Sequence, residues 1–120
     1  MFKDFPLPNH AQAFKAAEAA HCAGDQGKYW EMHDRMFADQ RALEVPALKD
    51  SATALGLNMP KFNQCLDSST HHDIVQADLD LGEKMGVNST PTIYINGRAV
   101  IGAQPWEVFK SIIDEELARK

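Results

Sequence analysis

The chain has 120 residues, 44% of them hydrophobic, and a formal net charge of -5, which suits one compact domain with its own core. Its acidic groups are scattered among lysines, which disfavours a nucleic-acid partner because a phosphate backbone attracts basic surfaces. No segment approaches eighteen consecutive apolar residues, and the residues after Met1 lack the apolar core and cleavage site of a signal peptide. We therefore expect neither a membrane span nor an export signal.

The N-terminal half of the sequence predicts a short strand followed by helices. Two aromatic residues precede Pro6 and Pro8, a pattern typical of a strand that runs into a loop. Asn9 is expected to cap the alanine-rich helix that follows, and Asn58 to cap the last helix of this half. The expected elements are a strand at 1–5 and helices at 11–23, 28–38, 46–55 and 58–66.

The C-terminal half predicts a longer helix, a β-hairpin and a closing helix. Gly86 is suited to end the longer helix, and Asn96-Gly97 is the strongest short-range signal for a hairpin turn. The expected elements are a helix at 70–85, strands at 92–95 and 99–101 and a helix at 105–118. Five aromatic residues on the predicted helices are interpreted as core: Trp30, Phe37, Phe62, Trp106 and Phe109.

The most specific motif is the segment from Gly86 to Arg98, with the sequence GVNSTPTIYINGR. Proline cannot donate a ladder hydrogen bond, so Pro91 suits a strand entrance, where the bond before it can be cis. This segment resembles the cis-proline loop and hairpin of the thioredoxin fold. Residues 22–34 resemble the first inserted helical pair of DsbA-like thiol-disulfide oxidoreductases, and residues 100–109 resemble the last strand and helix of that family.

The resemblance implies an α/β, thioredoxin-like fold in a single domain over residues 1–120, with an inserted helical subdomain at about 9–86. In the full family, a first strand and a helix that begins with Cys-x-x-Cys come before the position of Met1, so the fold is expected to be incomplete at its N-terminus. No Cys-x-x-Cys occurs in the sequence. The chain is therefore interpreted as the cis-proline portion of a bacterial oxidoreductase, similar to a disulfide isomerase and redox-inactive alone. For the full-length family a periplasmic location is expected.

The resemblance assigns substrate binding to Thr90 and Pro91. In the superfamily this proline is cis, and the backbone of the residue before it pairs with an extended peptide by strand addition. A trans proline at a strand entrance is the simpler alternative. The expected partners are extended protein or peptide segments. The missing strand would lie between the strands at 1–5 and 92–95, and its absence favours a homodimer or a strand-swapped dimer.

Neither Cys22 nor Cys65 has the sequence setting of a reactive thiol, and no catalytic residue is predicted. A reactive cysteine needs a pKa lowered by a helix N-terminus or a neighbouring thiol, whereas Cys22 lies near the end of a predicted helix and Cys65 inside another. From the residues alone, a disulfide, two free thiols and a relocated redox pair all remain open. The resemblance implies that the inserted helices pack together, so that the two sulfurs lie close and form a possible structural disulfide.

The histidines do not predict a metal site, and no cofactor is expected. Only His71-His72-Asp73 is dense, but adjacent side chains on a helix diverge, whereas zinc requires three or four converging ligands. Ser69 or Thr70 followed by Asp73 is better explained as an N-terminal helix cap.

Two further functions remain open. The alternative from a different class is a non-catalytic, thioredoxin-like peptide-binding or interaction module that keeps the groove without the redox helix. A weaker interpretation is a glutathione-dependent isomerase on a similar scaffold. An in-frame Cys-x-x-Cys encoded just upstream of the Met1 codon would favour the oxidoreductase.

Overall fold

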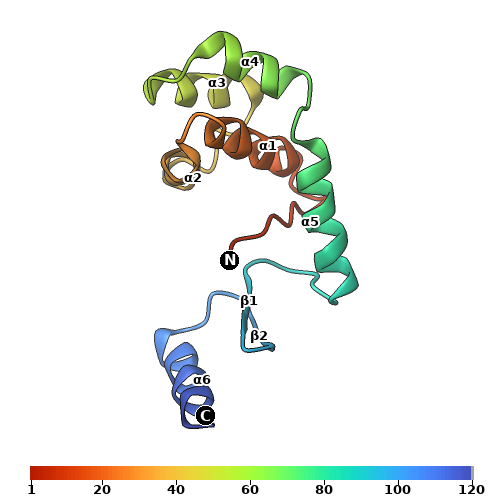
Figure 1. Ribbon diagram of the computed structural model, residues 1–120, viewed down its shortest axis with the longest axis vertical. Coiled ribbons are helices and arrows are strands. Elements are labelled where there is room, and N and C mark those ends of the chain that lie inside the picture. The colour runs from red at the N-terminus through yellow and green to blue at the C-terminus, as the bar shows by residue number, and fades with distance from the viewer. Residues whose placement is uncertain (120) are drawn as a thin grey trace. The chain divides into compact units, whose positions relative to one another are not determined.

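The computed structural model describes residues 1–119, whose contacts form two compact units, the first from Met1 to Leu81 and the second from Gly82 onward. Figure 1 shows the described elements in chain order. The helices are α1 (Ala13–Gly24), α2 (Tyr29–Ala38), α3 (Val45–Ala54), α4 (Met59–Asp67), α5 (His72–Lys84) and α6 (Trp106–Ala118), and the strands are β1 (Thr92–Ile95) and β2 (Arg98–Ile101). None of these helices has both the length and the apolar character that crossing a bilayer requires.

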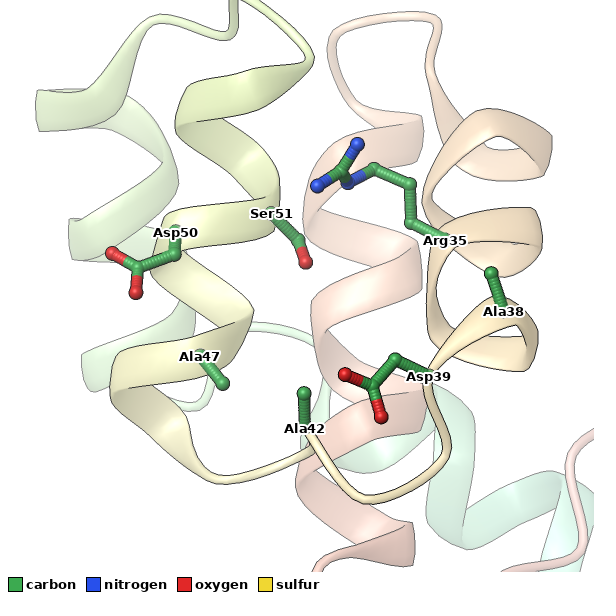
Figure 2. Close-up of a pocket in the computed structure, with 7 residues that line it drawn as sticks. All are labelled: Arg35, Ala38, Asp39, Ala42, Ala47, Asp50 and Ser51. Atoms are coloured by element: carbon green, nitrogen blue, oxygen red, sulfur yellow. The ribbon is translucent and has the colours of Figure 1, made fainter.

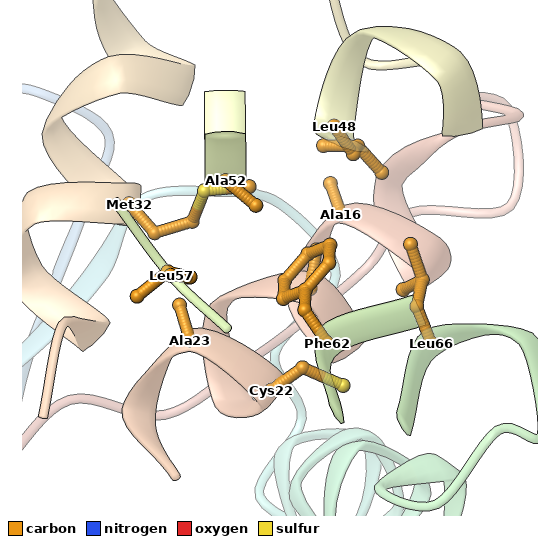
Figure 3. Packing of buried hydrophobic residues seen from close by; sticks show 10 residues of the cluster. Ala16, Cys22, Ala23, Met32, Leu48, Ala52, Leu57, Phe62 and Leu66 are labelled. Carbon is orange, nitrogen blue, oxygen red and sulfur yellow. The ribbon is translucent and has the colours of Figure 1, made fainter. Parts of the chain in front are cut away.

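Helix α1 is the centre of the first unit and contacts α2, α3 and α4. Its buried face is made mainly of alanines, which allow neighbouring helices to approach closely. Phe62 of α4 is fully buried against this face, as Figure 3 shows. The other large side chains of the core come from α2, α3, α4 and the loop before α4: Met32, Leu48, Leu66 and Leu57.

The helices begin and end within two residues of the predicted positions, but two of the predicted caps are wrong. Asn58 does cap α4, since its side chain accepts a hydrogen bond from the N–H of Lys61 at 3.2 Å. Asn9 does not cap α1: an additional turn precedes this helix, and Gln12 occupies the N-cap position. Ser69 has a positive φ of 54°, and its hydroxyl accepts from Lys15 rather than from the first turn of α5.

The predicted strand at Met1–Phe5 is wrong, because this segment is irregular. A strand exists only when a neighbour completes its ladder of hydrogen bonds, and within residues 1–119 the two strands pair with each other. The N-terminal segment is held by side chains instead. The N–H of Asp4 donates to Oδ2 of Asp78 at 3.0 Å, and the carboxylate of Asp4 hydrogen-bonds Nε2 of His21 at 2.7 Å.

The expectation that five aromatic residues form the core is correct for Phe62 and wrong for Trp30, Phe37 and Trp106, while Phe109 is half-buried. Trp30 and Phe37 are 54% and 61% exposed. They share one face of α2 because they are seven residues apart, whereas the buried residue of this helix, Met32, projects from another face. Helix α6 has no buried residue, which leaves Trp106 exposed.

The second unit contains the predicted hairpin. Strands β1 and β2 are antiparallel, with Thr92 opposite Ile101 and Ile95 opposite Arg98. Asn96 and Gly97 have φ values of 49° and 83°, which a two-residue type I′ turn requires. Two ion pairs connect the hairpin to α6, since Nη1 of Arg98 lies 2.8 Å from Glu115 and 3.3 Å from Glu116.

Candidate functional site

The loop between α5 and β1 carries Thr90 and Pro91, and the peptide bond between them is cis. Gly86 ends α5 with a φ of 84°, a left-handed conformation that glycine adopts without a steric penalty. At the other end of the loop, the hydroxyl of Thr92 donates to the carbonyl of Ser89 at 2.8 Å. The loop is therefore held by local interactions on both sides of Pro91.

Strand β1, which follows the loop that carries Thr90, has an outer edge that faces away from β2. The N–H of Gly102 donates to the carbonyl of Pro91 at 2.8 Å, so Pro91 points toward β2. Because successive residues of a strand alternate between its two edges, Thr92 and Tyr94 of β1 direct their backbone groups away from β2. Thr90 is exposed, and within residues 1–119 its N–H and C=O have no hydrogen-bond partner. Within residues 1–119 no strand pairs with this edge of β1.

Cys22 and Cys65 form a disulfide between α1 and α4, with their Cα atoms 5.8 Å apart. Both cysteines lie in the first unit, whereas the Pro91 loop lies in the second. Neither sulfur is a free thiol. The disulfide cross-links α1 to α4 and leaves no free thiol that could act as a nucleophile.

A histidine and an aspartate lie beside this disulfide. Nε2 of His71 is 2.7 Å from Oδ2 of Asp25, and the same oxygen lies 3.7 Å from Sγ of Cys65. This group is not predictable from the sequence, because His71 and Asp25 are 46 positions apart and no spacing rule connects them. Cys22, which is buried, has its sulfur within 4.8 Å of the ligand atoms of Cys65 and His71.

A buried group of charges holds the N-terminal segment against α1 and α5. Burial raises the pKa of Asp4, while its hydrogen bond with His21 acts in the opposite direction. The ring of His21 also lies 5.4 Å from the ring of Tyr29. Burial, followed by the negative charges of Asp4 and Asp78, raises the pKa of Tyr29 to about 12.

An aromatic cluster lies on the surface of the first unit, and it includes Trp30 and Phe37, which were expected in the core. The ring of Phe2 is 5.6 Å from that of Trp30 and 5.4 Å from that of His33, and His33 stacks on Phe37 at 4.5 Å. A cavity of about 220 Å³ lies beside it, lined mainly by apolar side chains that include Tyr29. The sequence shows the helical spacing of Trp30, His33 and Phe37. It does not show that their rings pack against each other at the surface and not in the core.

A second cavity, of about 330 Å³, lies between α2 and α3 (Figure 2). Its lining combines three charged side chains with alanines and a serine: Arg35, Asp39, Asp50, Ala38, Ala42, Ala47 and Ser51. None of the residues that the sequence analysis selected as functional lines this cavity.

The chain resembles known proteins over nearly its whole length. The model of a family described as thioredoxin matches residues 1–115. The curated relatives include the Na(+)/H(+) antiporter NhaA 1 of Salinispora arenicola, 34% identical over 119 residues, which are 98% of this chain and 18% of the relative. NhaA 1 of Mycolicibacterium vanbaalenii is 34% identical over 124 residues, 100% of this chain and 20% of the relative. NhaA of Herminiimonas arsenicoxydans is 32% identical over 108 residues, which are 90% of this chain and 17% of the relative. The chain thus spans about a fifth of the length of these relatives.

Proposed function

Because the chain belongs to the thioredoxin family, we propose that it supplies the peptide-binding, cis-proline portion of a DsbA-like protein thiol-disulfide oxidoreductase. The observation that carries the proposal is the unpaired outer edge of β1 beside Thr90, an exposed residue whose backbone N–H and C=O have no hydrogen-bond partner within residues 1–119. An extended peptide adds to such an edge as a further strand, and its side chains then alternate toward and away from the protein.

We expect this chain alone to bind peptides without exchanging their disulfides. Exchange requires a thiolate with a lowered pKa and a second thiol that resolves the mixed disulfide. The sequence contains two cysteines, and the structure joins them to each other, each in the second half of its own helix. On this proposal the chain keeps the residues that bind a peptide and lacks the thiols that exchange its disulfides.

The binding half of the proposal is tested by titrating an extended, cysteine-containing peptide into the chain and following its backbone amides by NMR. We expect the largest shifts at Thr90 and Thr92. The Thr90→Pro variant removes the N–H that would pair with the peptide and should abolish binding. Ala99→Pro is the matched control, because Ala99 lies opposite Tyr94 and its N–H faces the other edge of the hairpin. Far-UV circular dichroism verifies that both variants fold.

Two results would contradict peptide binding at this edge. One is equal affinity of the peptide for the Thr90→Pro and Ala99→Pro variants. The other is a set of shifted amides that lies entirely within the first unit, for instance around the aromatic cluster of Phe2, Trp30 and Phe37.

The redox half of the proposal is tested with an insulin-reduction assay on the whole chain. We expect turnover no faster than that of a simple dithiol, and no change in the Cys22→Ser and Cys65→Ser variants. Rapid turnover that either substitution abolishes would show that the two cysteines are an active site in a new position.

A second candidate is a non-catalytic interaction module, and the curated relatives favour it. They are named Na(+)/H(+) antiporters, and the similarity covers 90% to 100% of this chain but only 17% to 20% of the three relatives described above. A domain of this kind would bind an antiporter or one of its segments without redox chemistry. The genomic DNA upstream of the Met1 codon separates the two candidates. An in-frame Cys-x-x-Cys supports the oxidoreductase, and an antiporter reading frame supports the module.

A further inference from the structure

Three potential metal ligands converge at the disulfide of the first unit, and a fourth side chain, that of Asp25, lies beside two of them. Ligand atoms of Cys22, Cys65 and His71 all lie within 4.8 Å of one another. Oδ2 of Asp25 lies 2.7 Å from Nε2 of His71 and 3.7 Å from Sγ of Cys65. The four side chains come from the last turn and C-cap of α1, from α4 and from the residue before α5. Helix packing therefore brings together residues that are distant in the sequence.

We propose that these four side chains bind one zinc ion when the disulfide is reduced. Two thiolates, an imidazole and a carboxylate are ligands that Zn²⁺ accepts in a tetrahedral site. With metal–ligand bonds of about 2.0–2.3 Å, tetrahedral ligand atoms lie about 3.3–3.8 Å apart. Oδ2 of Asp25 already lies 3.7 Å from Sγ of Cys65, whereas its 2.7 Å hydrogen bond with Nε2 of His71 must lengthen when both groups bind the metal. Breaking the disulfide allows the two sulfurs to separate to the same spacing.

The oxidation state of the cysteines would decide whether the site exists. A dithiol reductant transfers two electrons and two protons to the disulfide of the chain. The reductant is oxidised to its own disulfide, and Cys22 and Cys65 become thiols. Zn²⁺ then displaces one proton from each thiol and binds the two thiolates. In the oxidised chain each sulfur is bonded to the other, and no thiolate is available to the metal.

The burial of the four side chains suits a metal site that opens on one side. Cys22 is 1% exposed, and the side chain of His71 is 22% exposed, so the thiolate and imidazole are largely shielded from water. The side chain of Asp25 is 54% exposed, which provides a path for the ion to enter. His72, the next residue, does not join the group, because its ring packs 4.9 Å from that of Phe14.

The test uses the whole chain and two probe metals. Co²⁺ is titrated into the chain reduced with a phosphine, with the oxidised chain in parallel, and bound Zn²⁺ is quantified after gel filtration. We expect one equivalent of metal on the reduced chain, with a thiolate-to-cobalt charge-transfer band and the visible spectrum of a tetrahedral site. We expect none on the oxidised chain.

The variants distinguish a site in which all four side chains bind the metal from adventitious binding by the two thiols alone. His71→Ala should weaken Co²⁺ binding by about tenfold or more, and Asp25→Asn should also weaken it. His72→Ala is the matched control and should bind like the unaltered chain. Equal affinities for the His71→Ala and His72→Ala variants would overturn the proposal, as would a reduced chain that binds no metal. A reduced chain that unfolds and that Zn²⁺ does not refold would overturn it as well. None of these results depends on peptide binding in the second unit.

Discussion

Tyr29 should keep its proton well into the alkaline range. Burial and the charges of Asp4 and Asp78 raise its pKa to about 12, whereas an unfolded tyrosine ionises near pH 10. The folded state therefore holds this proton more tightly than the unfolded state. Its contribution to stability is fully present below about pH 10 and is lost as the pH rises toward about 12. Tyrosinate absorbance against pH measures the shift directly in the Tyr94→Phe chain, because the sequence has two tyrosines.

The carboxylates around Tyr29 provide the control for this titration. Replacing Asp4 or Asp78 with asparagine removes a negative charge that opposes ionisation, so the midpoint of Tyr29 should fall while remaining above 10 because burial persists. A midpoint near pH 10 in the Tyr94→Phe chain itself would show that Tyr29 is not buried as the structure has it.

Phe62 and Phe37 form a matched pair of phenylalanines in opposite environments. Phe62 is fully buried and Phe37 is 61% exposed. Phe62→Ala should lower the free energy of unfolding by about 3–5 kcal/mol, because it removes apolar contacts and leaves a cavity. Phe37→Ala should change it by roughly 0.5 kcal/mol. Urea denaturation of both variants measures the difference, and similar losses would contradict the assigned core.

At the scale of the elements, α4 depends on Asn58 in two ways. Its side chain caps the helix by accepting from Lys61, and its backbone N–H and C=O bond the side-chain amide of Gln26 at 2.7 and 3.2 Å. Asn58→Ala removes only the cap and should cost about 1 kcal/mol. Asn9→Ala is the control, because Asn9 lies outside the N-cap of α1. Equal losses in thermal denaturation would mean that both asparagines act as caps.

At the scale of the whole molecule, the disulfide should stabilise the first unit alone. It connects positions 43 residues apart, and closing a loop of that length contributes about 4 kcal/mol on the chain-entropy model. Reduction should therefore speed amide exchange in α1 and α4 and leave the hairpin of the second unit unchanged, since that unit contains no cysteine. Hydrogen exchange with and without reductant, in metal-free buffer, measures the exchange rates of the amides in both units. Equal acceleration in both units would show that they unfold together.

The hairpin also predicts self-association. A sheet of two strands has two edges without partners, and such edges pair with strands of other chains. We expect a dimer at high micromolar concentration. Light scattering measures the mass, and a monomer at that concentration would contradict association through these edges.

The sequence by itself determined the features that depend on neighbouring residues. Asn58 caps α4 by bonding a residue three positions away, and Asn96-Gly97 forms its turn because few other residues tolerate positive φ at both positions. The helix bounds were predictable in the same way, because glycine favours the end of a helix and proline its first turn. These short-range interactions could be predicted from the sequence because both partners lie within one turn of helix or one hairpin.

Only the tertiary structure decided which surfaces are buried and which distant side chains meet. The periodicity of α2 showed that Trp30 and Phe37 share a face, but burial depends on whether another element covers that face, and none does among the described residues of the first unit. Met1–Phe5 has the composition of a strand, yet a strand needs a partner that composition does not supply. Likewise, Asp25 and His71 meet beside the disulfide because α1 and α4 pack together, and packing between residues some 46 positions apart leaves no local signal.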